Sequence, residues 1–237
     1  MRAKSRTLLA ALAASLALLA VGAAGAQAKV IDLTGTTTFT PSAEATQFLA
    51  NHGVTVGPTG EATAENGAFV FPIAGGFATP RNYSGLLAHK GGLEFTKGER
   101  SAIVRNFVAV RVRGAGAVLL AQVPGLRGGC AHLRTALHAF ALEHPVAARR
   151  VRRVARRLPG SGHLLQAVRD YCKGGRVIVL AHLKNLSKEL TYGGAVLRAD
   201  LELSRQAARL VNKVAGEEAV SAGAPLGSAE STVAVVD

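Results

Sequence analysis

This sequence of 237 residues has few cysteines, no long hydrophobic run and no recognisable catalytic or nucleotide-binding motif. Cys130 and Cys172 are the only cysteines, which excludes the disulfide-dense scaffolds of small secreted proteins. No G-x-S-x-G, H-E-x-x-H, P-loop or dinucleotide-binding fingerprint occurs, and no spacing of carboxylates or histidines indicates a catalytic pair or a metal site. We therefore expect neither an enzyme nor a metal centre. A secreted hydrolase without a recognisable motif is the remaining catalytic alternative, because fold does not determine function.

The first 28 residues have the pattern of a secretory signal peptide. Basic residues at positions 2, 4 and 6 precede an apolar run at 8–21, and Ala26-Gln27-Ala28 matches an A-x-A cleavage site. The apolar run has about 14 residues, whereas a helix that crosses a bilayer needs roughly 20. We therefore expect a signal peptide at 1–28, a secreted or cell-surface location, and no transmembrane segment in the mature chain.

The mature chain, residues 29–237, has a length that fits a single domain, and the sequence is hydrophobic enough (49%) to form a core. Short runs of β-branched and aromatic residues between glycines and prolines are typical of β-strands. The runs are 34–40, 68–73, 86–95, 103–113, 117–123, 176–183 and 195–203. Along 103–113, aliphatic residues alternate with a largely basic set, which predicts a strand with one solvent-facing side. The predicted fold class is mainly β, an antiparallel β-sandwich.

Residues 130–172 differ from this pattern because their apolar residues recur with the period of a helix. Leu133 and Leu137, for example, lie on the same helical face. The segment begins at Cys130 and ends at Cys172, and two cysteines that bracket such a segment in an exported chain predict a disulfide. We therefore predict an inserted, disulfide-closed helical subdomain at 130–172.

The predicted insert also carries most of the excess positive charge. It contains eight arginines and two acidic residues, a net charge of +6 out of +10 for the mature chain. Six of these arginines lie close together on one predicted helix: Arg149, Arg150, Arg152, Arg153, Arg156 and Arg157. Such a surface attracts anions, so an anionic cell-envelope polymer is a possible partner, and a merely solvated basic face is the alternative. No motif for sequence-specific recognition of nucleic acid occurs.

A faint internal repeat relates two segments that are 162 positions apart. Residues 39–49 align without a gap with residues 201–211, and each segment places a serine, Ser42 or Ser204, where it can cap a short helix. The predicted fold therefore includes two short Ser-capped helices. The pair either frames a site around a pseudo-twofold axis or only closes the two ends of the fold.

The most specific local pattern is a histidine that precedes a Gly-Gly bend. Residues 69–76 read F-V-F-P-I-A-G-G, and residues 89–95 read H-K-G-G-L-E-F. Gly91 and Gly92 would let the backbone or a flat ligand approach closely, and the His89 imidazole could then form a hydrogen bond or ligate iron. Alternatively, His89 holds a bulge together through hydrogen bonds to the backbone. Both interpretations stay open at this point.

These runs, together with the strand around Phe39, resemble the HtaA-type domain family of bacterial haem-binding surface proteins. The resemblance covers 36–126 and, more loosely, 176–236, with the insert outside it. It implies a mostly antiparallel β domain that binds haem through a tyrosine near the start of the domain, supported by a histidine in the Gly-rich strand. His89 matches the histidine, but Ser42 stands where the tyrosine is expected. Tyr83 or Tyr192 could replace it if the fold brings either one near His89.

The sequence thus leads to two hypotheses about function. The first is an exported cell-surface or secreted binding module without catalysis, with haem as its candidate cofactor and a candidate site at His89, Tyr83, Gly91 and Gly92. The second is an envelope-associated structural protein that contacts anionic polymers through the arginines of the insert. Added salt would weaken contact with a polyanion steeply but would hardly affect haem binding.

Overall fold

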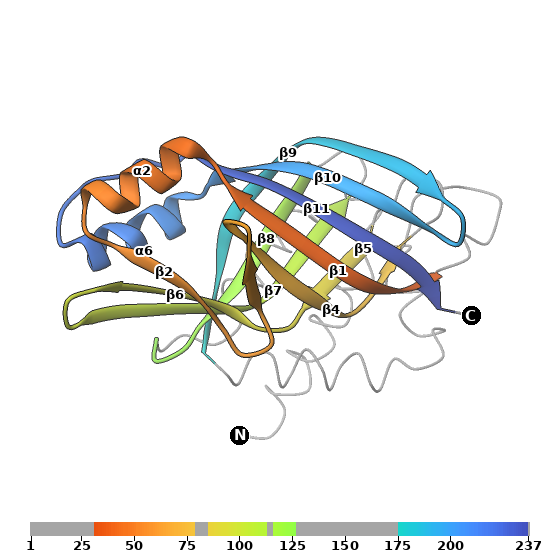
Figure 1. Ribbon diagram of the computed structural model, residues 1–237, viewed down its shortest axis with the longest axis horizontal. Helices are drawn as coiled ribbons and strands as arrows, with labels where there is room; N and C mark the ends of the chain where they lie inside the picture. Colours follow the sequence, from red (N-terminus) through yellow and green to blue (C-terminus); the bar gives the residue numbers. More distant parts are fainter. Residues whose placement is uncertain (1–30, 79–84, 113–115, 127–174, 237) are drawn as a thin grey trace, which may run out of the picture.

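The computed structural model describes residues 31–78, 85–112, 116–126 and 175–236 (Figure 1). Three predictions fall outside these ranges: the signal peptide at 1–28, the insert at 130–172 with its cysteines and arginines, and the candidate site residue Tyr83. They stay predictions from sequence. Within the described ranges, no helix is long and apolar enough to cross a membrane.

Strands dominate the described part of the chain. They are β1 (Ile31–Pro41), β2 (Thr55–Thr59), β3 (Thr63–Glu65), β4 (Ala68–Ala78), β5 (Gly85–His89), β6 (Gly92–Lys97), β7 (Arg100–Val112), β8 (Gly116–Val123), β9 (Arg176–Thr191), β10 (Gly194–Leu203) and β11 (Pro225–Val236). The helices are α2 (Ala43–Asn51) and α6 (Arg205–Ala215). Each predicted run lies in one strand as far as it is described, except that 86–95 forms two strands, β5 and β6.

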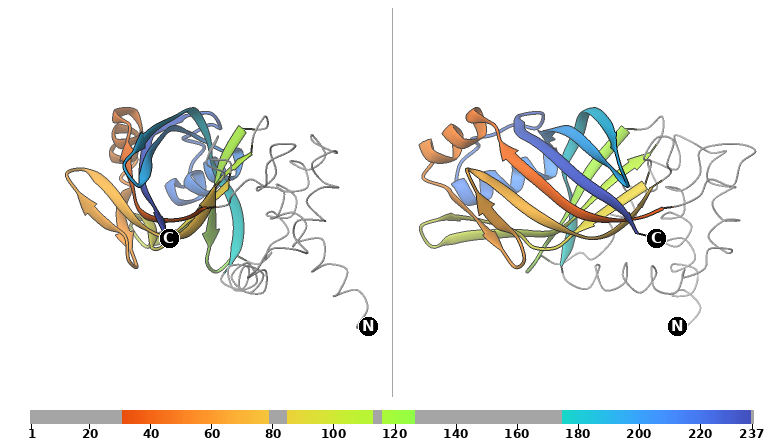
Figure 2. Two further views of the ribbon diagram at one scale, coloured as in Figure 1. Left: turned by 90° about the vertical axis from the view of Figure 1, so that its right-hand side faces the viewer. Right: turned by 45° about the vertical axis from the view of Figure 1, so that its right-hand side comes forward.

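Eight of the strands close into an antiparallel barrel (Figures 1 and 2). They pair in the order β7-β5-β4-β1-β11-β10-β9-β8, and β8 pairs back to β7. The prediction of antiparallel β structure is confirmed, but the predicted sandwich is wrong. Because β8 has a partner on each side, the eight strands have no edge at which they could separate into two packed sheets. Strands of barrels and sandwiches both bury one face, so the hydrophobic pattern does not distinguish them.

On the side away from β8, strand β7 pairs with one strand along its first half and with another along its second half. Residues 100–105 pair with β6, and residues 108–111 pair with β5. Between them the ladder to β8 shifts register, and Asn106 adopts a positive φ of 52°. The N–H of Asn106 donates to the Gly91 carbonyl at 2.8 Å. This β-bulge lets β5 and β6 follow one another along the same side of β7.

The bulge also changes which side chains of β7 are buried. Val104 and Phe107 are three positions apart, yet both pack in the interior with exposures of 0% and 4%. On the opposite face, Val108 and Val110 are buried as well, at 9% and 3%. The predicted solvent-facing, largely basic side of this strand is correct at Arg105, which is exposed, but wrong beyond the bulge, because strict alternation does not continue through a bulge.

Helices α2 and α6 follow equivalent strands and are capped in the same way. The Ser42 hydroxyl accepts a hydrogen bond from the Ala45 N–H at 3.0 Å, and the Ser204 hydroxyl accepts one from the Ala207 N–H at 3.1 Å. The preceding strands, β1 and β10, both pair with β11. The two Ser-capped helices predicted from the internal repeat are therefore confirmed.

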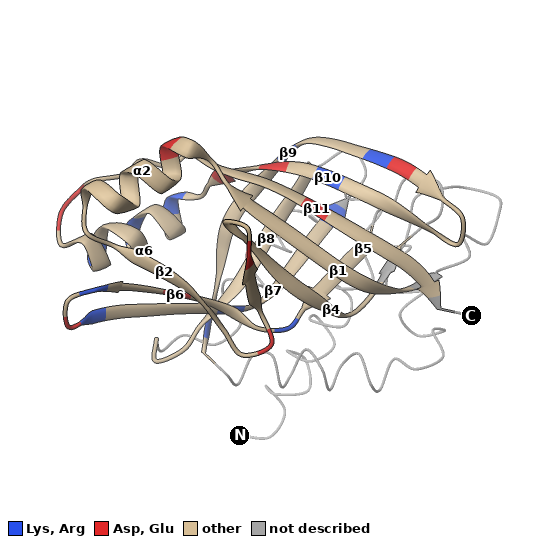
Figure 3. Ribbon diagram, in the orientation of Figure 1, with Lys and Arg blue, Asp and Glu red and all other residues tan. Residues whose placement is uncertain are grey.

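Both helices lie at one end of the barrel, which we call the helix end (Figure 1). The opposite end, where β5 begins at Gly85 and β10 begins at Gly194, is called the hairpin end. Charged residues lie mainly on the helices, the β6–β7 hairpin and the β9–β10 pair (Figure 3). Strands β4, β5 and β8 contain no Lys, Arg, Asp or Glu. The interior of the barrel is therefore mainly apolar.

Candidate ligand-binding cavity

A cavity of about 780 Å³ lies inside the barrel. Its wall extends from Phe48 of α2 and Leu210 of α6 at the helix end to Gly85 and Ala117 at the hairpin end. Sites for small molecules and cofactors typically measure roughly 300 to 1,000 Å³, and an eight-stranded barrel is wide enough to hold one small ligand. The cavity is therefore the candidate functional site.

Phenylalanine is concentrated on the wall of this cavity. Six of the eight phenylalanines in the sequence line it: Phe39, Phe48, Phe69, Phe71, Phe95 and Phe107. The rings of Phe39 and Phe69 stack with their centroids 6.5 Å apart, and Phe71 meets Phe107 edge to face at 5.1 Å. These residues come from α2 and from strands on several sides of the barrel, so only the closed fold brings them together. Such a wall suits a flat or elongated apolar ligand.

A relay of buried polar groups interrupts the apolar wall. The His89 Nε2 lies 2.8 Å from the Thr37 hydroxyl, which lies 2.8 Å from the Ser231 hydroxyl, and the His89 Nδ1 lies 3.1 Å from the Phe107 carbonyl oxygen. The three side chains are 6–9% exposed and line the cavity. This group, which we call the His89 relay, connects β5, β1, β11 and β7.

The hydrogen bonds determine the tautomer of His89. A carbonyl oxygen only accepts, so Nδ1 carries the proton and donates to Phe107, while Nε2 accepts from the Thr37 hydroxyl. Burial lowers the pKa of the His89 imidazole from 6.5 to about 4, and the hydrogen bond to Phe107 opposes this only in part. At neutral pH the ring is uncharged and both nitrogens are engaged. To ligate iron, His89 would have to give up its bond to Thr37.

The two glycines that follow His89 are required by the turn between β5 and β6 rather than by the cavity. Gly91 adopts a φ of 79° where the chain turns from β5 into β6, and a side chain at this position would collide with the backbone of Ala62. A side chain at Gly92 would collide with the backbone of β7. Neither glycine lines the cavity. The His89 bond to the Phe107 carbonyl, beside the β7 bulge, supports the alternative in which the histidine holds a bulge together.

The described wall of the cavity offers no free side chain that could ligate the iron of a haem. Ser42 caps α2 and is not part of the cavity wall, and Tyr192 is fully exposed between β9 and β10. In the ranges that the structure covers, His89 is the only wall residue among the histidines, tyrosines, cysteines and methionines. Across the same ranges, no group of three or more His, Cys, Asp or Glu could hold a metal ion. The ligation of haem iron that the family resemblance implies thus has no free ligand among the described residues.

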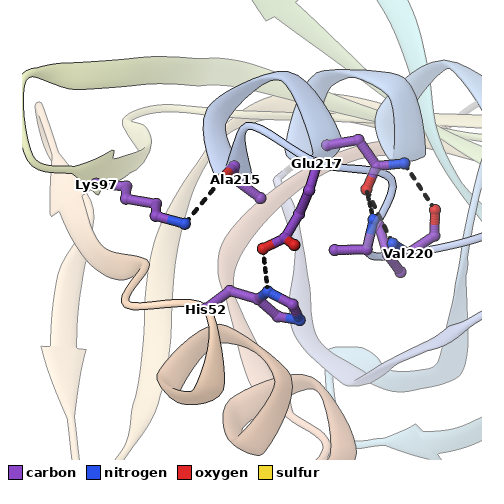
Figure 4. A network of polar contacts seen from close by, with 7 residues as sticks. His52, Lys97, Ala215, Glu217 and Val220 are labelled. Atoms are coloured by element: carbon purple, nitrogen blue, oxygen red, sulfur yellow. Dashed lines mark hydrogen bonds and ion pairs between the residues drawn. The ribbon is translucent and has the colours of Figure 1, made fainter.

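Polar contacts hold the two helices in place at the helix end (Figure 4). The His52 Nδ1, at the C-cap of α2, lies 2.7 Å from a carboxylate oxygen of Glu217, which follows α6. The Lys97 ammonium, from the β6–β7 hairpin, donates to the Ala215 carbonyl at 2.8 Å. A cation at this position also complements the negative end of the α6 dipole. The contacts thus connect α2, α6 and the hairpin, all of which contribute to or border the cavity wall.

Sequence reasoning missed most of the wall. Thr37 and Ser231 gave no signal, because threonine and serine are common in strands and their partners lie up to 194 positions away. Phe39, Phe69 and Phe71 were placed in strands, but nothing in a single strand shows that they converge. The one available signal was the spacing of two, F-x-F at 69–71, which places both rings on the same face.

Comparisons with known proteins support the fold. The C-terminal domain of HtaA from Corynebacterium glutamicum is 15% identical over 86% of this chain and 99% of that domain, with a TM-score of 0.51. The haem-binding protein HtaB from the same organism is 8% identical over 88% of this chain and 96% of that protein, with a TM-score of 0.48. No family model and no curated protein matches the sequence. The resemblance to HtaA-type domains is therefore confirmed as a likeness of fold.

Proposed function

We propose that this chain is an exported, non-catalytic binding module that holds an apolar ligand of about porphyrin size inside its barrel. The cavity of about 780 Å³ with its phenylalanine-lined wall is the observation that carries the proposal. The resemblance to HtaA-type domains makes haem the first ligand to test. In this proposal the wall holds the ring, and the His89 relay keeps the strands in register.

The geometry of the relay favours binding over catalysis. A serine and a histidine in one relay resemble a nucleophile and its base, but Thr37 stands between Ser231 and His89. The second ring nitrogen of His89 donates to a backbone carbonyl rather than to a carboxylate. No arrangement of nucleophile, base and orienting acid follows from these contacts.

A haemin titration followed by visible absorbance tests the proposal. Ala109 lines the cavity, so Ala109→Phe should fill part of it and abolish a saturable spectral shift. Ala234→Phe makes the same change at an exposed position of β11 and should bind haemin as the wild type does. Ala199→Phe, on another part of the wall, serves as a second filling variant if the first does not fold. A shift of equal size in all folded variants would contradict binding inside the barrel.

The second candidate function rests on the sequence of the insert alone. Its six clustered arginines, Arg149 to Arg157, favour contact with an anionic envelope polymer. A variant with four of these arginines changed to alanine should no longer pellet with cell envelopes at low salt, and added salt should release the wild type. The four positions are Arg149, Arg152, Arg153 and Arg156. A variant that still pellets at low salt would contradict this function.

A further inference from the structure

Arg111 is a cation on the wall of the cavity. It lies near the hairpin end of β7, paired with Gly85 of β5 and Ala117 of β8, and all three residues line the cavity. Ala109, two positions earlier, packs in the apolar interior, and the alternation of a strand places Arg111 on the same face. Because one neighbour has no side chain and the other only a methyl group, the wall has room beside Arg111.

Arg111 has no partner in the part of the chain that the structure describes. Neither a hydrogen bond nor an ion pair joins it to those residues, although it is half-buried. Arg198, the other arginine on the described wall, is engaged, because it contacts Glu189 at 3.1 Å and Glu230 at 2.7 Å. A cation that is partly removed from water without a partner is unfavourable, so an anion at this position would stabilise the site.

The remainder of the wall shows where such an anion could come from. Within the described ranges, Glu44 is the only carboxylate that lines the cavity, and it belongs to α2 at the opposite end. From Gly85, beside Arg111, to His89 the strand β5 advances four residues, or about 13 Å. Beyond His89 the phenylalanine-lined wall continues to the helices. Arg198 also lines the cavity, but it is paired with Glu189 and Glu230. Arg111 is therefore the only unpaired cation on the described wall, and it lies at one end of a long apolar surface, which matches an amphiphile with an anionic head.

We propose that the cavity takes an apolar ligand that bears a carboxylate, with the carboxylate paired to Arg111 and the apolar body directed toward the helix end. This inference rests on the proposed function and adds the group that selects the ligand. A guanidinium and a carboxylate form two parallel charge-assisted hydrogen bonds, and no metal takes part. Long-chain fatty acids and porphyrins, through their propionates, both present this chemistry.

Calorimetric titration of the full chain with matched acids and esters tests the inference. The pairs are oleic acid with methyl oleate, and protoporphyrin IX with its dimethyl ester. The wild type should bind the acid of at least one pair about 10-fold or more tightly than its ester. In Arg111→Gln that acid should bind only as well as its ester, and Arg111→Lys should keep part of the preference. The control Arg209→Gln, at an exposed position of α6, should retain it in full. The pair that shows the preference identifies the source of the carboxylate.

Three outcomes would overturn the inference in distinguishable ways. Equal binding of acid and ester by the wild type would overturn the pairing with a carboxylate but leave the proposed function intact. A preference that survives in Arg111→Gln would assign the carboxylate to another residue. If acids, esters and haemin all fail to bind, the proposed function itself is wrong. Should Arg111→Gln not fold, the ratio of acid to ester in the wild type and in Arg111→Lys decides.

Discussion

Acidification should weaken the fold through His89. Burial holds the pKa of this imidazole at about 4 in the folded protein, against 6.5 as its ordinary value in the unfolded chain. Between these values the unfolded chain binds a proton that the folded chain does not, so the free energy of unfolding decreases as the pH falls from 6.5 to about 4. Each pH unit in this interval contributes about 1.4 kcal/mol, which gives a loss of about 3 kcal/mol.

Urea denaturation of the wild type and of His89→Gln isolates this effect. Carboxylates and the other histidines titrate in both proteins, so their contributions cancel in the difference between the two free energies of unfolding. Near neutral pH we expect the variant to be less stable by about 1 to 3 kcal/mol, because it disturbs buried hydrogen bonds to Thr37 and Phe107. At about pH 4 the gap should have decreased by about 3 kcal/mol. A gap that is the same at both pH values would refute a neutral, buried His89.

Further predictions concern the caps, the glycine bend and the disulfide. Ser42→Ala should lower the free energy of unfolding by about 1 kcal/mol, and Ser204→Ala by about 2 kcal/mol or more. Both hydroxyls also donate to a carbonyl, but the Ser204 bond to β9 is made by a buried side chain, whereas the Ser42 bond to Pro225 is exposed and 3.4 Å long. Equal losses in urea denaturation would contradict this. Gly91→Ala should cost clearly more than Gly67→Ala, since both have a φ of 79° but only Gly91 is crowded by backbone, and a thermal melt compares them. The secreted protein should have an intact mass lower by two hydrogens than its reduced form, and free thiols in the native protein would contradict the predicted disulfide.

The features of the fold that the sequence predicts correctly are mostly those that depend on residues close together in the chain. Ser42 and Ser204 were correct as helix caps because a cap depends on groups within three residues of the serine. The strands were correct for a similar reason, since β-branched runs between turns indicate extended structure wherever their partners lie. The sequence indicates the bend at Gly91 and Gly92, but not that this bend divides 86–95 into two strands, because the backbone of Ala62 that crowds Gly91 is brought there only by the fold.

Closure of the barrel and the polar relay depend on contacts between distant residues. The β7–β8 and β8–β9 pairings decide between barrel and sandwich, and the alternation within each strand is the same in both. The sequence singles out His89 correctly, but Thr37 and Ser231, the other side chains of its relay, come from opposite ends of the sequence. Arg111 was assigned to a solvent-facing side, because the bulge at Asn106 that places it on the cavity wall leaves no mark in the hydrophobic pattern.

Parallel titrations with haemin and with metal-free protoporphyrin IX test most directly whether the apolar wall or an iron ligand holds the ligand. The same purified protein is titrated with both compounds, and Ala109→Phe serves as the filled-cavity control. If the wall is sufficient, the two dissociation constants lie within about 10-fold of each other and the control loses both. Tight binding of haemin with no binding of the metal-free ring would contradict this, and would require an iron ligand outside the described residues.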